Sequence, residues 1–81
     1  MVKLSGWRQK VNKRMFKRWD FYSPDGKMLG YIELKRIGKW SVRLVYKIAD
    51  KSKTLTLNTM REAEVTATQM KRQAEKMFYK K

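Results

Sequence analysis

The chain of 81 residues contains no cysteine, no histidine and a single proline. Without cysteine there is no disulfide framework and no thiolate metal ligand. Without histidine the commonest general base and the commonest metal ligand are both missing. We therefore expect a protein that is not an enzyme, with no catalytic residues, no metal site and no cofactor.

Acidic residues are also scarce. Seven Asp and Glu face 21 Lys and Arg, which gives a formal net charge of +14. No apolar run approaches the ~20 residues of a membrane span, and the N-terminus has no apolar segment of signal-peptide length. The hydrophobic content of 42%, with three Trp, four Tyr and three Phe, favours a folded domain over a disordered basic tail. We expect an intracellular protein, cytoplasmic or nucleoid-associated, with a polyanionic partner.

Half of the net charge lies in residues 1–18, which contain seven basic residues and no acidic one. We interpret this segment as a basic N-terminal arm or short helix in front of a single domain over residues 19–81. Gly6 and Asn12 disfavour a helix, so a helix and an arm that orders on binding both remain open. The apolar residues with helical spacing are Leu4, Trp7, Val11 and Met15.

Residues 18–57 have the pattern of a three- or four-stranded antiparallel meander. Ser23-Pro24-Asp25-Gly26 predicts a turn, because proline presets the second turn position and glycine accepts positive φ. Polar residues alternate with apolar ones from Trp40 to Ile48, which predicts a half-buried strand. We expect further turns at 38–39 and 50–53, and a last strand over 54–57.

A helix follows the sheet. Thr59 and Glu62 form a capping box, so the helix should begin near Met60. Its apolar stripe should cover one face of the sheet, which makes the fold class α+β. The expected stripe is Met60, Ala63, Ala67, Met70, Ala74 and Met77. The expected layer beneath it is Trp19, Phe21, Ile32, Leu34, Trp40, Val42, Leu44, Tyr46, Leu55 and Leu57.

The other face of the sheet should be uncovered, mixing basic residues and tyrosines around one central acidic residue, Glu33. Such a face can dock in a DNA major groove or stack unpaired bases on tyrosines. Asp20 and Glu33 are best explained by salt pairing across the first hairpin. The candidate nucleic-acid-binding residues of this face and of the N-terminal segment are Arg43, Lys47, Lys35, Arg18, Tyr31, Tyr22, Arg14, Lys13, Lys10 and Arg8.

A family resemblance rests on residues 38–74. The residues that carry it are Gly38-Lys39-Trp40-Ser41-Val42-Arg43, Tyr46-Lys47, Asp50-Lys51 and Thr59-Met60-Arg61-Glu62-Ala63. Together they resemble the N-terminal arm-binding domain of phage and transposon tyrosine recombinases. The resemblance implies a three-stranded sheet over a C-terminal helix, with the sheet in the major groove and Arg43 and Lys47 facing the bases. Leu57-Asn58 stands where the family usually has Gly-Phe, the first hairpin adds a strand, and recombination activity is not implied.

Two hypotheses follow from the sequence. The first is a nucleic-acid-binding protein, with duplex DNA favoured over RNA. The second is a small effector or inhibitor that binds an acidic protein, since basic charge also steers protein association. One apolar patch formed by Trp7, Phe16, Tyr22 and Tyr31 would favour a protein partner, whereas aromatic residues scattered among cations favour nucleic acid. The basic residues and Val65 on the outer side of the helix are expected to be a solvated face. The oligomeric state is left open.

Overall fold

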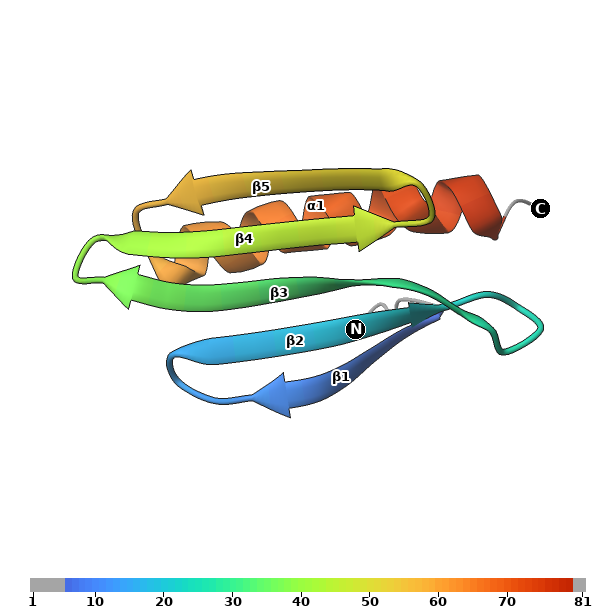
Figure 1. Ribbon diagram of the computed structural model, residues 1–81, viewed down its shortest axis with the longest axis horizontal. Helices are drawn as coiled ribbons and strands as arrows, with labels where there is room; N and C mark the ends of the chain where they lie inside the picture. The colour runs from blue at the N-terminus through green and yellow to red at the C-terminus, as the bar shows by residue number, and fades with distance from the viewer. Residues whose placement is uncertain (1–5, 80–81) are drawn as a thin grey trace.

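The computed structural model describes residues 6–79. One antiparallel sheet has its strands in chain order, and a single helix follows it (Figure 1). The elements are β1 (Trp7–Asn12), β2 (Phe16–Tyr22), β3 (Met28–Gly38), β4 (Ser41–Ile48), β5 (Lys51–Leu57) and α1 (Met60–Phe78). The predicted α+β class is confirmed, and the sheet has five strands rather than three or four. In the part of the chain that the structure describes, no helix is long and apolar enough to cross a membrane.

Within the N-terminal segment, residues 7–12 form a strand of the sheet and not a helix or a separate arm. β1 pairs antiparallel with β2, with Trp7 opposite Phe21. Without this pairing β2 would be an edge with open backbone donors and acceptors. The Trp7 ring lies 4.5 Å from the Phe21 ring, and its indole Nε1 donates to the carbonyl of Lys71 over 3.2 Å. The pairing of β1 with β2 and the packing of Trp7 favour a strand, although the apolar residues of this segment have helical spacing. Leu4, the first residue of that spacing, lies outside the described residues.

The turns agree in part with the expectation from sequence. The turn between β2 and β3 is confirmed, because Gly26 has φ 91° and its N–H donates to the Ser23 carbonyl over 2.9 Å. The next turn is displaced by one residue, so that Gly38 pairs with Ser41 across it. The turn after β4 consists of Ala49 and Asp50, and residues 51–53 belong to β5 instead.

Both ends of α1 are secured by hydrogen bonds. The Thr59 side chain accepts from the Glu62 N–H over 3.1 Å, which confirms the predicted N-cap. At the other end, the Tyr79 N–H donates to the Glu75 carbonyl over 2.6 Å. The Tyr79 hydroxyl donates to the Tyr22 carbonyl, which ties the end of α1 to the end of β2.

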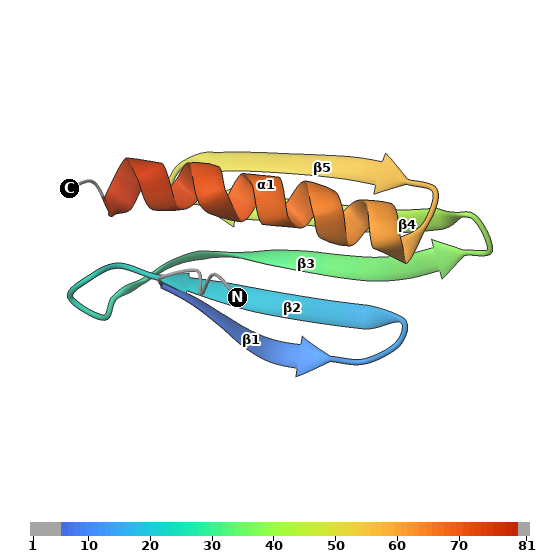
Figure 2. The ribbon, with the colours of Figure 1, turned by 180° about the vertical axis from the view of Figure 1, so that it is seen from behind.

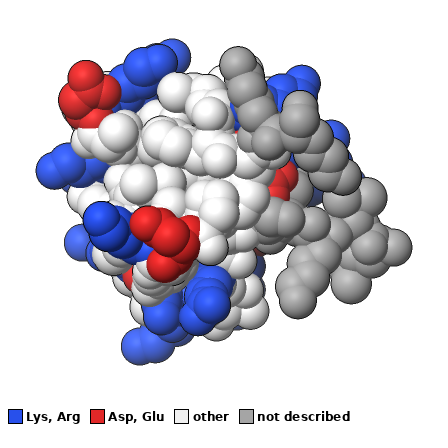
Figure 3. All heavy atoms as spheres, turned by 90° about the vertical axis from the view of Figure 1, so that its right-hand side faces the viewer, with Lys and Arg blue, Asp and Glu red and all other residues white. Residues whose placement is uncertain are grey.

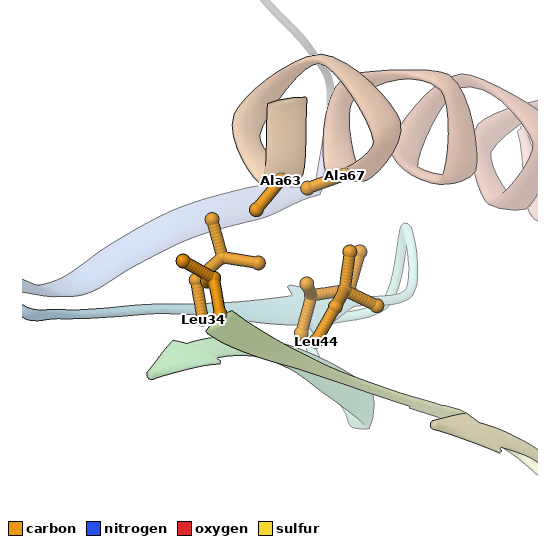
Figure 4. Packing of buried hydrophobic residues seen from close by; sticks show 6 residues of the cluster. Leu34, Leu44, Ala63 and Ala67 are labelled. Atoms are coloured by element: carbon orange, nitrogen blue, oxygen red, sulfur yellow. The ribbon is translucent and has the colours of Figure 1, made fainter. Parts of the chain in front are cut away.

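The core lies between α1 and the strands it crosses, β3, β4 and β5 (Figure 2). Leu34 and Leu44 are register partners, and both point toward Ala63 and Ala67 of the helix (Figure 4). Alanines let the helix lie close to the leucine layer. The nine buried apolar residues are Phe21, Ile32, Leu34, Val42, Leu44, Ile48, Ala63, Ala67 and Ala74. The predicted core is therefore confirmed in its centre.

Two predicted core residues are exposed. Trp40 is 65% exposed, because it belongs to a turn and the strand pleat does not aim it at the helix. Met77 is 47% exposed, since the last turn of α1 extends past the start of β5 (Figure 1). In contrast, Lys71 is buried, and its Nζ lies 3.4 Å from the centre of the Trp19 ring. Its aliphatic stem occupies a place on the helix that a sequence pattern assigns to apolar residues.

Candidate nucleic-acid interface

The helix covers one face of the sheet. Among residues 6–79 no element covers the opposite face, which we call the open face (Figure 1). Its side chains follow from the pleat, because successive residues point to opposite sides of a strand. Leu34 and Leu44 point toward the helix, so Lys35 and Arg43 point away from it. The register places Lys35 and Arg43 directly opposite each other on β3 and β4.

Three predicted binding residues of β3 and β4 lie exposed on the open face. They are Lys35, Arg43 and Lys47. None of the ion pairs found within residues 6–79 involves them, and neither does any side-chain hydrogen bond there. Like charges directly opposite each other, as at Lys35 and Arg43, repel. Viewed end-on, basic side chains project on the side of the open face, with an acidic group at the upper edge (left in Figure 3). Lys35, Arg43 and Lys47 thus have no anionic partner among the described residues.

Two hydroxyl side chains extend this group onto β5. Thr56 lies opposite Arg43, and Thr54 lies opposite Val45. Both threonines are exposed. Hydroxyls both donate and accept, so they suit phosphate oxygens and base edges alike. Neither threonine is among the predicted binding residues, although the predicted inward positions of Leu55 and Leu57 already place Thr54 and Thr56 outward.

Arg18, also predicted as a binding residue, is held in ion pairs on the open face, with its side chain 30% exposed. Its Nε donates to Oδ1 of Asp20 over 2.9 Å, and its Nη1 donates to Oε2 of Glu33 over 2.8 Å. The guanidinium carbon lies 4.4 Å from the centre of the Tyr31 ring. The hydrogen bond to Asp20 is the largest cause of a raised Arg18 pKa, and Glu33 adds to the effect. The salt pairing expected for Asp20 and Glu33 is therefore confirmed.

This cluster changes the electrostatics of the open face. Asp20 is only 7% exposed, and the charges of Asp20 and Glu33 are both met by Arg18. Arg18 is thus occupied and does not offer a free guanidinium to a ligand. Arg18 affects binding only indirectly. Because it neutralises Asp20 and Glu33, the cations of β3 and β4 have no unpaired carboxylate beside them within the described part of this face.

The two tyrosines of the open face are covered by cations. Arg8 lies 5.1 Å and Lys10 lies 5.7 Å from the centre of the Tyr22 ring. A bulge between Gln9 and Val11 lets Arg8 and Lys10 reach the same ring. The Tyr31 ring carries Arg18 in the same manner. Both rings therefore already have a cation partner, and Arg8 and Lys10 themselves are exposed on β1.

The remaining predicted residues, Lys13 and Arg14, lie in the loop between β1 and β2. Both are exposed. Lys13 exchanges two backbone hydrogen bonds with Phe16, over 2.8 and 3.3 Å, which closes this loop. The structure therefore places them at the end of the sheet, while Arg8, Lys10, Lys35, Arg43 and Lys47 lie along it.

No group of three His, Cys, Asp or Glu residues lies close enough to hold a metal ion within residues 6–79. Comparisons of the chain with protein-family models, curated proteins and solved structures gave no match.

Proposed function

We propose that this protein binds nucleic acid through the open face of its sheet, and that it binds duplex DNA in preference to RNA. The observation that carries the proposal is the group formed by Lys35, Arg43 and Lys47. These cations are exposed on one flat face, and the carboxylates beside them are held by Arg18. This role would place the protein with nucleic acid, in the cytoplasm or the nucleoid.

The distribution of aromatic side chains supports nucleic acid over an acidic protein partner. Trp7 packs on the helix side of the sheet, against Phe21 and α1. Tyr22 and Tyr31 on the open face are each covered by cations. Phe16 lies opposite Lys35. These residues do not gather into the apolar patch with a basic rim that the hypothesis of a protein partner predicts.

The shape of the interface favours a duplex. The major groove of B-DNA is about 12 Å wide and accepts a β-ribbon, whereas that of A-form RNA is too deep and narrow for side chains to read. Recognition of single-stranded RNA depends on stacking of bases on aromatic rings, and the rings of Tyr22 and Tyr31 each already contact a cation. Arg43 at the centre of β4 is the candidate for contact with a guanine edge, with Lys35 and Lys47 beside it.

The added strands suit contacts with the DNA backbone. Neighbouring strands are ~4.8 Å apart, so β1 lies ~14 Å from β4 across the sheet. This separation is similar to the width of the major groove. When β4 lies in the groove, Arg8 and Lys10 of β1 therefore reach the phosphates at its edge. The recombinase arm-binding domains that residues 38–74 resemble use a three-stranded sheet in this manner. In this proposal β3, β4 and β5 form the three strands that lie in the groove, and β1 contacts the DNA backbone.

Fluorescence anisotropy with duplex DNA, single-stranded DNA and duplex RNA, each over a salt series, tests the proposal. We expect duplex DNA to bind most tightly, with a log–log salt slope of about −4 to −5 for about five phosphate contacts. Arg43→Ala should weaken duplex binding by about 1–3 kcal/mol if Arg43 reads a base.

The matched control is Arg72→Ala, which removes an exposed arginine from the helix and leaves the open face unchanged. Equal losses of duplex affinity in Arg43→Ala and Arg72→Ala would indicate that the interaction is nonspecific charge attraction. No binding to any of the three probes at low salt would refute the proposed function. A partner that survives nuclease treatment in a pull-down would then favour an acidic protein.

A further inference from the structure

A hollow of about 460 Å³ lies at one end of the sheet, where the β1–β2 loop meets the β3–β4 turn. Its lining residues are Arg14, Met15, Arg36, Gly38 and Lys39. The Arg36 N–H donates to the Met15 carbonyl over 2.9 Å, which joins the loop to β3. The hollow therefore has a defined backbone frame built from two separate turns.

The guanidinium of Arg36 is held in place inside this frame. Its Nε donates to the Gly38 carbonyl over 3.2 Å, and its Nη2 donates to the Lys39 carbonyl over 2.8 Å. An arginine side chain has five N–H donors, so three remain for a ligand. Because the turn itself orients the group, an anion bound here would not have to order it.

The charge of the hollow is of one sign. Arg14, Arg36 and Lys39 contribute three cations, and no carboxylate is among the lining residues. Arg14 and Lys39 are exposed and take part in no ion pair within residues 6–79. Planar guanidinium groups match the oxygens of a phosphate, and an ammonium group adds a point charge.

We propose that this hollow binds a phosphate group of a nucleic-acid backbone. The inference rests on the proposed function and adds Arg36 and Lys39 to the interface. Arg36 directly follows Lys35 in β3 but pairs with Val42, so the pleat turns its side chain toward the helix side of the sheet. A nucleic-acid backbone that runs from the open face over this end of the sheet reaches both the pair of Lys35 and Arg43 and the hollow. A backbone contact at this point sets the register of the nucleic acid on the sheet and carries no sequence preference of its own.

The test is the salt dependence of duplex binding by the double variant Arg14→Ala/Lys39→Ala, measured by fluorescence anisotropy. Arg36 is left intact because it also holds the turn. We expect the variant to weaken binding equally on duplexes of different sequence and to lower the magnitude of the salt slope by about 1. Circular dichroism of the variant should match that of the wild type, since both side chains are exposed.

The matched control is Arg72→Ala/Lys76→Ala, which removes the same two charges from exposed positions of α1. Equal changes in the two double variants would overturn the proposal, because net charge alone would then explain them. Loss of binding with Arg43→Ala, together with no special effect of Arg14→Ala/Lys39→Ala, would reject the hollow and keep the proposed function. Absence of duplex binding by the wild type would reject both.

Two further probes identify the source of the phosphate. Inorganic phosphate and vesicles with anionic lipid are titrated against the wild type and the hollow variant. At concentrations where duplex DNA binds the wild type more tightly than the hollow variant, we expect inorganic phosphate and the vesicles to bind the two proteins equally. A variant that loses vesicle binding and keeps duplex binding would contradict the assignment to nucleic acid.

Discussion

Arg18 and Glu33 lie opposite each other on β2 and β3, and the Arg18 Nη1 donates to Oε2 of Glu33 over 2.8 Å. The Nε of the same guanidinium donates to Asp20 over 2.9 Å. One cation therefore satisfies two carboxylates at the centre of the open face. This arrangement gives Arg18 a role in stability and leaves Lys35, Arg43 and Lys47 as the groups available to a ligand.

Replacing Arg18 with methionine should destabilise the fold. Arg18→Met keeps most of the aliphatic stem and leaves the nearly buried Asp20 without its charge partner. Because an unpaired buried charge is costly, we expect the free energy of unfolding to fall by about 1–3 kcal/mol. Urea denaturation measures this change. Glu33→Gln is the matched control and should cost about 1 kcal/mol or less, since Asp20 keeps its partner. Wild-type stability of Arg18→Met would contradict the structural role of this cluster.

Lys71 should make stability depend on pH. Burial lowers its pKa from 10.5 to about 8, although the charge of Glu64 acts in the opposite direction. Below pH 8 the residue is protonated in both states, and the folded state bears the cost of burying the charge. Between pH 8 and 10.5 the unfolded chain binds more protons than the folded one. The free energy of unfolding should therefore rise with pH in this window.

The variant Lys71→Met isolates this effect. It should raise stability at pH 7 by about 1–2 kcal/mol, because the desolvation cost exceeds the attraction of the ammonium to the Trp19 ring. Burial raises the pKa of Tyr46, which lowers stability above pH 10 in both proteins. The informative quantity is thus the difference between wild type and variant in urea denaturation at pH 7 and pH 9.5. A difference that does not shrink with pH would contradict this account.

The burial of Lys71 and the pairing of β1 show why the sequence describes the periphery less well than the centre. Strict alternation in β4 and the capping box at Thr59 are local signals, and they suffice to predict the strand and the start of the helix. Lys71 is buried because its neighbours Ala67 and Ala74 face the sheet, whereas lysine is rarely buried in general. β1 has few apolar residues, and it forms because β2 offers it a partner. Such tertiary effects leave no local pattern.

Trp40 should contribute little to stability. It is 65% exposed in the β3–β4 turn, while Trp19 packs against the core and under Lys71. We expect Trp40→Ala to change the free energy of unfolding by less than about 0.5 kcal/mol. Trp19→Ala should cost about 2–4 kcal/mol, because it removes a large packed side chain. Thermal and urea denaturation of the two variants compare them directly. A loss at Trp40 as large as that at Trp19 would place Trp40 in the core after all.

Ala49 carries a local strain that glycine should relieve. It has φ 56° in the turn between β4 and β5, a region that residues with a Cβ adopt at a cost. Its N–H donates to the Leu29 carbonyl over 3.0 Å, a bond that Ala49→Gly keeps. We expect a gain of about 0.5–1 kcal/mol, after allowance for the greater freedom of glycine in the unfolded chain. The control Ala63→Gly, in the helix, should instead destabilise the protein. A loss of stability in Ala49→Gly would contradict the left-handed conformation.

The candidate site could be predicted from sequence wherever the strand pleat alone decides it. Period-two alternation placed Lys35, Arg43 and Lys47 on one exposed face, and the structure agrees. Alternation does not reveal which cations are already paired, so Arg18 looked equivalent to Arg43. The hollow at Arg36 and Lys39 depends on two turns meeting at the end of the sheet. The hollow forms only when several strands pair in the correct register. The local sequence of a single segment cannot predict that pairing.

Nuclear magnetic resonance tests the central claim most directly. Amide and side-chain signals of the protein are recorded during titration with a short DNA duplex. The account predicts the largest shifts at Lys35, Arg43, Lys47, Thr54 and Thr56 on the open face. Shifts concentrated instead on the exposed side of α1, at Arg61, Val65, Arg72 and Lys76, would contradict it.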